Sequence, residues 1–161
     1  MNAVAIDAYA KDLVEELLPY IRRQIDSEAP YYEGLQLEPI SDDDIRLLAW
    51  ESIVDLLYDC NREDIPGHAE LRLTRWLALV ALIRMLTFAE AQEACREAEG
   101  GGAIQSVTAL STSVTYAAPV SRSSQLKGRL TIYQSTADQH YRKLVHSLRR
   151  FPRWQRGRAY D

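Results

Sequence analysis

The C-terminal end of the chain carries the densest set of side chains suited to molecular recognition. Five arginines alternate there with three aromatic residues over positions 149–160. Arginine pairs with carboxylates and phosphates through a planar fork, and aromatic rings supply anchoring area in interfaces. The pattern predicts a basic-aromatic segment that docks on a partner. Its predicted binding residues are Arg149, Arg150, Phe151, Arg153, Trp154, Arg156, Arg158 and Tyr160.

Catalytic and metal-binding patterns are missing from the sequence. His140 and His146 are six positions apart, which fits neither spacing that places two metal ligands on one helix face. There is no G-x-S-x-G nucleophile elbow, and Cys60 and Cys95 lack the basic neighbours that lower the pKa of a thiol. Both cysteines lie on apolar-periodic stretches, so we expect reduced thiols in the core. We expect no enzymatic activity, no cofactor and no metal.

Three consecutive aspartates at positions 42–44 allow two interpretations. Carboxylates suit a hard cation, but consecutive residues at the start of a helix point in different directions. Ser41 just before them is a natural helix N-cap, and negative charge in a first turn favours the helix dipole. The capping interpretation is therefore the stronger one.

Charge divides the chain into an acidic front and a basic end. The net charge is −4, yet residues 1–70 carry 17 acids and 5 bases, and residues 101–161 carry 2 acids and 10 bases. Such asymmetry is typical of a chain that binds a partner, including a neighbouring copy of itself.

Apolar periodicity predicts three helices in the first hundred residues. The first covers residues 4–25, with Pro19 expected to kink or split it. The second begins at the Ser41 cap and extends to Cys60. The third covers residues 68–99 and is apolar almost all round, which predicts a central helix. Its most apolar stretch is too short for a bilayer, so no membrane partner is expected.

Beyond the glycines at 100–102 the composition changes, with twelve Ser or Thr between positions 106 and 136. Residues 107–116 and 128–133 are rich in β-branched residues and predict a hairpin arm. The assembly residues expected on this arm are Val107, Leu110, Val114, Tyr116, Leu130 and Ile132. A short helix is expected from residue 135 to Pro152.

The predicted fold is mainly α, in one domain with arms. A helical bundle occupies residues 1–100, with a long central helix. A small Ser/Thr-rich β-hairpin arm occupies residues 101–134. A short C-terminal helix with the extended basic-aromatic docking tail occupies residues 135–161.

This order of elements resembles the head–tail connector, or adaptor, proteins of long-tailed bacteriophages. The resemblance rests on SVTALSTSVTY at residues 106–116, followed by YRKLVHSLRR at residues 141–150. It spans about residues 41–150. The N-terminal helix and the long spacer at residues 117–127 depart from the family pattern.

The resemblance implies a non-catalytic protein of the virion neck, made in the host cytoplasm. Family members form a ring, commonly of twelve copies, below the portal protein. The ring extends the DNA channel without binding a specific sequence, and it offers a docking surface to the stopper or tail-completion protein. Transferred here, residues 149–160 would bind the portal, and the arm would contact neighbouring copies, the stopper or the channel.

A second hypothesis needs no ring. A small helical nucleic-acid-binding or regulatory protein could use the same basic C-terminal tail. It predicts binding whose affinity falls steeply with salt, as expected when lysine and arginine neutralise phosphates. The net negative charge and the lack of a helix-turn-helix pattern argue against it.

Overall fold

Four α-helices account for nearly all of residues 2–28, 37–98 and 122–150, which are the residues that the computed structural model describes. Helix α1 is Ala3–Glu28, α2 is Asp42–Asp59, α3 is Gly67–Ala98 and α4 is Arg122–Arg150. The mainly α prediction is confirmed, and no strand occurs in these three ranges. The proposed first strand, residues 107–116, lies outside them.

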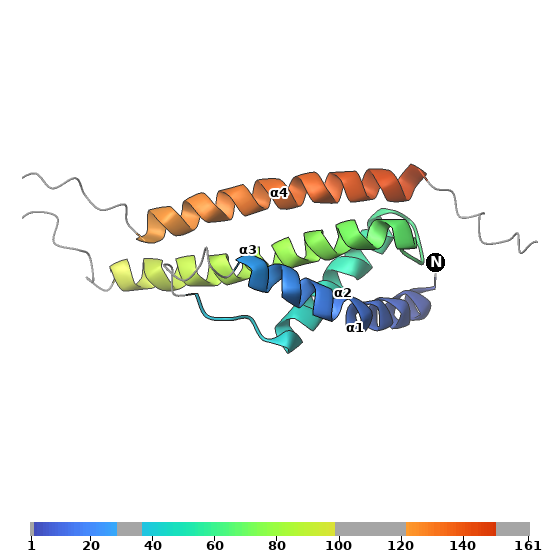
Figure 1. Ribbon diagram of the computed structural model, residues 1–161, viewed down its shortest axis with the longest axis horizontal. Helices are drawn as coiled ribbons and strands as arrows, with labels where there is room; N and C mark the ends of the chain where they lie inside the picture. The colour runs from blue at the N-terminus through green and yellow to red at the C-terminus, as the bar shows by residue number, and fades with distance from the viewer. Residues whose placement is uncertain (1, 29–36, 99–121, 151–161) are drawn as a thin grey trace, which may run out of the picture.

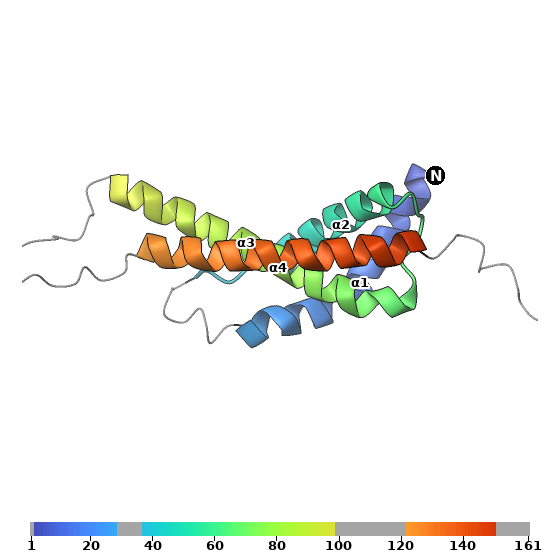
Figure 2. The ribbon, with the colours of Figure 1, turned by 90° about the horizontal axis from the view of Figure 1, so that it is seen from above.

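Helix α3 is the centre of the structure, as predicted. It lies between α4 on one side and the pair α1 and α2 on the other (Figure 1). Seen from above, α4 runs along α3 in the opposite direction, α2 lies on one side of this pair, and α1 crosses beneath it from the side of α2 to the other side (Figure 2). Fully buried side chains from all four helices, including Ile21, Ile53, Leu73 and Leu144, form one continuous core.

Helices α1, α2 and α3 follow local signals in the sequence. Ser41 caps α2, because its hydroxyl accepts a hydrogen bond from the backbone N–H of Asp44 at 3.1 Å. Helix α3 begins and ends one residue earlier than predicted. Pro19 does not split α1, which continues on both sides of it. Pro19 is exposed, so water can reach the carbonyl that loses its helical partner there.

The predicted second strand is wrong, because residues 128–133 belong to α4. The last helix begins at Arg122, 13 residues before the predicted start, and has 29 residues. Leu126, Tyr133 and Ala137 are buried and repeat at helical spacing, so packing against α3 outweighs the β propensity of the segment. A side chain at Gly128 would meet only open space, so the glycine costs the α3–α4 interface no packing contact.

The two cysteines differ in their surroundings. Cys60 is buried, as expected, but Cys95 is exposed, which corrects the prediction of a core thiol. Cys95 lies near the end of α3, where the helix has passed beyond α1 and α2 and no longer needs an apolar face all round.

None of the described helices combines enough length with enough apolar character to cross a lipid bilayer.

Candidate partner-docking site

The predicted basic-aromatic segment begins in the last turn of α4, and that end of the helix is held in place by a buried arginine. Arg62, in the turn between α2 and α3, is only 8% exposed. Its guanidinium donates to the backbone oxygen of Leu148 at 3.0 Å and to that of Asp64 at 3.2 Å. It also pairs with the Asp64 carboxylate at 3.4 Å. Arg62 therefore satisfies a carbonyl in the last turn of α4, which has no partner within the helix.

Asp59 joins the same end of α4 to the end of α2. Its backbone oxygen accepts a hydrogen bond from Arg149 at 3.0 Å, and its carboxylate accepts one from the Tyr141 hydroxyl. Burial, and then the Asp59 carboxylate, raise the pKa of Tyr141, so the phenol remains a donor at neutral pH. We call Asp59, Arg62, Asp64, Tyr141 and Arg149 the exit clamp.

Local backbone chemistry places Arg62 in this position. Asn61 has a positive φ of 50°, a conformation that asparagine adopts more readily than most residues. The N–H of Asn61 bonds to the oxygen of Tyr58 at 3.0 Å, and the N–H of Arg62 bonds to that of Leu57 at 2.9 Å. This pair of bonds is a Schellman motif, which ends α2 and turns the chain toward α4. Further along, the Tyr9 hydroxyl accepts from the N–H of Ile65 at 2.8 Å and fixes the turn to α1.

The structure places only part of the predicted site. Arg149 and Arg150 are the last residues of α4, and both are exposed. Leu130 is half-buried against the core, and Ile132 is 62% exposed, both on α4 instead of on a strand. The remaining predicted residues lie outside the described ranges; they are Val107, Leu110, Val114, Tyr116, Phe151, Arg153, Trp154, Arg156, Arg158 and Tyr160.

An apolar groove that the sequence did not indicate lies between the start of α2 and the second half of α3. It has a volume of about 380 Å³, and its apolar lining includes Leu47, Met85 and Phe88. Leu47 and Phe88 are 53% and 55% exposed. Glu38 and Asp44 add carboxylates to the lining and Arg84 adds a cation. The signal in the sequence is weak, since single exposed apolar residues on a helix look like part of its core stripe.

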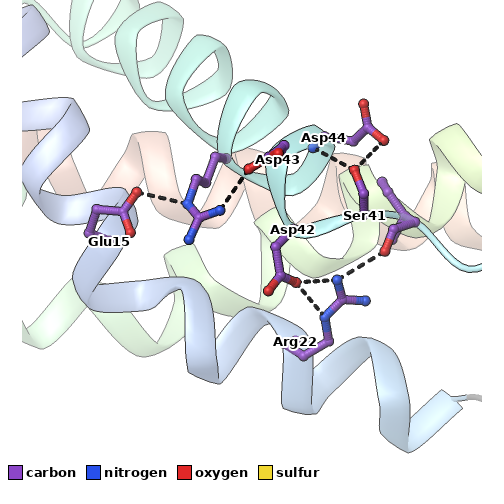
Figure 3. Close-up of polar contacts among 8 residues, drawn as sticks. Glu15, Arg22, Ser41, Asp42, Asp43 and Asp44 are labelled. Atoms are coloured by element: carbon purple, nitrogen blue, oxygen red, sulfur yellow. Dashed lines mark hydrogen bonds and ion pairs between the residues drawn. The ribbon is translucent and has the colours of Figure 1, made fainter.

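The three aspartates at the start of α2 act in capping and in ion pairing with α1. Asp42 accepts from Arg22 of α1 at 2.9 Å, and Arg22 also donates to the backbone oxygen of Ile40 (Figure 3). Arg46 bridges Asp43, at 2.8 Å, and Glu15 of α1, at 2.9 Å. The guanidinium of Arg22 lowers the pKa of Asp42. These contacts support the capping interpretation.

The described residues contain no group of three His, Cys, Asp or Glu side chains that could hold a metal ion. Burial raises the pKa of the Cys60 thiol, which makes it a poorer nucleophile at neutral pH. The described part of the chain offers a restrained C-terminal end of α4 and an apolar groove. Comparisons with protein-family models, with curated proteins and with solved structures give no match for this chain.

Proposed function

We propose that the protein is a non-enzymatic head–tail adaptor of a bacteriophage. In this proposal, copies of the chain, twelve by analogy with the family, form a ring below the portal in the neck of the virion. The ring extends the DNA channel and offers a surface to the stopper or tail-completion protein. The observation that carries the proposal is the exit clamp, which holds the start of the basic-aromatic segment at one end of a helical bundle.

The clamp matters because a segment binds its partner more tightly when its attachment point is fixed. Ordering a free chain on a partner costs conformational entropy, and a fixed base reduces the number of residues that must be ordered. Asp59 holds Arg149, the first residue of the segment, so binding to the portal would not have to fix the position of this residue. The arginines and aromatic rings that follow are the residue types that dominate interface energetics.

A closed ring of identical copies needs two different surfaces on each copy that fit one another. The apolar groove supplies one such surface, with exposed Leu47 and Phe88 inside it. Its carboxylates, Glu38 and Asp44, complement the positive charge of the C-terminal third of a second copy. This complementarity supports self-association through the groove.

Mixing the protein with the portal protein encoded in the same phage genome tests the proposal. The decisive variant ends after Arg150, because Leu148 bonds to Arg62 of the clamp, Arg149 belongs to the clamp, and removal of either would disturb the fold. We expect it to lose portal binding by at least about a hundredfold, since interface arginines and aromatics are typical hot spots. Val4→Ser, a change at a residue that is 78% exposed at the other end of the chain, is the control.

Electron microscopy of the mixture distinguishes the adaptor from other portal-binding proteins. The full chain should appear as a ring below the portal, coaxial with its channel. Full binding by the variant that ends after Arg150 would disprove the docking assignment. A single bound copy, without a ring, would disprove the adaptor function.

A further inference from the structure

Helices α3 and α4 bring four basic side chains together at one edge of their contact. Arg72 and Arg75 come from the first half of α3, and His140 and Lys143 come from α4. The Arg72 guanidinium donates to the backbone oxygen of Lys143 at 3.4 Å. The rings of Trp76 and Tyr141 pack beside them, with centroids 5.2 Å apart, and fix the register of the two helices. We call Arg72, Arg75, His140 and Lys143 the basic seam.

Positive charge in the basic seam is not neutralised by the described part of the chain. Arg22, Arg46 and Arg62 each pair with a carboxylate. Arg72, Arg75 and Lys143, in contrast, form no ion pair with a carboxylate in the described ranges, and all three are exposed. In a chain whose net charge is negative, a group of unpaired cations at one place indicates an anionic ligand.

The surroundings of His140 agree with this surplus of positive charge. Its pKa is lowered mainly by burial, and the positive charges of Lys143, Arg75 and Arg72 lower it further. No carboxylate is among the causes of this shift, so the imidazole lies in a net positive electrostatic potential. Its buried Nδ1 atom has no hydrogen-bond partner among the described residues.

The shape and chemistry of the surroundings favour a phosphate backbone over a protein partner. Interfaces between proteins are built around apolar anchors in pockets, whereas nucleic-acid interfaces are polar and positively charged. Two hollows of the described part of the chain lie around Phe88 on the second half of α3, and no residue of the basic seam lines either of them. Residues 139–150 of α4 contain four arginines or lysines and no acid, so positive charge continues along the helix from the seam.

We infer that the basic seam binds the phosphate backbone of duplex DNA without reading its sequence. This goes beyond the proposed adaptor function, which requires only that DNA passes through the ring. It also differs from binding by the C-terminal tail, because the seam is formed by side chains of two packed helices. Guanidinium forks match phosphate geometry, and their arrangement on a rigid helix pair is preorganised for contact.

Binding of the full chain to a fluorescent duplex of mixed sequence tests the inference. The seam variant is Arg72→Gln/Arg75→Gln. Its control, Lys11→Gln/Arg23→Gln, removes the same charge from exposed cations that lie outside both the seam and the groove. Each lost phosphate contact lowers the slope of log affinity against log salt by about 0.9. The seam variant should therefore show a slope shallower by about 1.8 and bind at least about tenfold more weakly at ~50 mM salt, whereas the control should change little.

A third protein, which ends after Arg150, separates the seam from the tail. It should keep most of the salt-dependent binding if the seam is the site. The inference is overturned if the full chain does not bind at ~50 mM salt, or if the seam variant and its control behave alike. It is also overturned if only the truncation abolishes binding, or if poly-glutamate displaces the duplex as well as a second duplex does. Portal capture by the seam variant tests the adaptor proposal separately.

Discussion

The two ends of the α3–α4 pair are stabilised in different ways. At the exit clamp, all four helices or their turns meet, and an arginine that is 8% exposed bonds to the last turn of α4. At the opposite end, α3 and α4 extend beyond α1 and α2 (Figure 1). Lys127 pairs there with Glu90 at 3.6 Å and Arg122 with Glu93 at 3.3 Å. We call this second end the extension.

This contrast shows where a small helical protein can concentrate its stability. The contact of Arg62 with Leu148 is buried and costly to disrupt, because the groups left behind cannot hydrogen-bond to water. The Lys127–Glu90 pair of the extension is largely exposed on the lysine side and contributes little. Arg149, the first residue of the proposed docking segment, belongs to the clamp, so the strongest restraint lies next to that segment. Four predictions test whether the two ends differ as the contacts indicate.

Removal of a core leucine at each end should have the largest effect. Leu144 and Leu126 are both 0% exposed on α4, toward the clamp and in the extension respectively. Leu144→Ala should destabilise the fold by about 4 kcal/mol and Leu126→Ala by about 2 kcal/mol, because two helices can close around a cavity more easily than four. Urea unfolding followed by circular dichroism measures both values. Equal losses would mean that the extension is packed as rigidly as the clamp end.

Replacement of the buried arginine should have the next largest effect. Arg62→Met keeps much of the apolar stem but removes the donor of the buried Leu148 carbonyl and the contact with Asp64, and it should lower the free energy of unfolding by about 2–3 kcal/mol. The matched control is Arg96→Met in the extension, where the side chain is 67% exposed and its ion pair with Glu93 spans 3.6 Å. The control should cost less than about 0.5 kcal/mol. A loss of the same size in both variants, measured by urea unfolding, would contradict the role given to the clamp.

Thiol accessibility compares the two ends without changing the core. Cys95 of the extension is exposed and Cys60 beside the clamp is buried, with its pKa raised by burial. Ellman's reagent at pH 8 should modify Cys95 at once and Cys60 at least about tenfold more slowly, since the second reaction needs a local opening. Cys95→Ser isolates the slow phase. The rate at which the reagent modifies Cys60 should rise further above pH 8, because more of the thiol ionises. Modification of Cys60 as fast as that of Cys95 would show that the clamp opens readily.

The smallest effect is expected at the surface of the extension. Lys127→Gln removes an ion pair whose side chains are 64% and 25% exposed. The loss in free energy of unfolding should stay below about 0.5 kcal/mol and disappear at ~1 M salt, where charges on exposed groups are screened. Thermal unfolding at low and high salt measures it. A larger, salt-independent loss would show that this end is held by more than surface charge.

Sequence patterns predicted elements whose signals are local. The Ser41 cap and the acids after it fixed the start of α2, and apolar residues on almost every face identified α3 as the central helix. The start of α4 was missed because β-branched residues and Gly128 outweighed a stripe made by Leu126, Leu130 and Tyr133. Cys95 was misplaced because periodicity shows that a residue lies on an apolar face but not how far the partner helices extend.

The exit clamp could not be predicted from the sequence. Its contacts join residues 82, 86 and 90 positions apart, and no pattern marks which arginine will meet which carbonyl. Asn61 is the one residue of this region whose type indicates a local structure, because asparagine adopts the left-handed conformation that ends a helix more readily than most residues. The groove was missed for a related reason, because it forms where two helices diverge and their separation depends on the whole packing.

The antiparallel register of α3 and α4 also sets an order for folding. Arg122 meets Glu93 across 29 positions of the chain, Arg72 meets Lys143 across 71, and Arg62 meets Leu148 across 86. Because loop closure becomes costlier with length, pairing should begin at the extension and proceed along the helices, and the clamp should close last. Contacts that form after the transition state slow unfolding without speeding folding. Folding would then begin at the extension, and the exit clamp would determine the rate of unfolding.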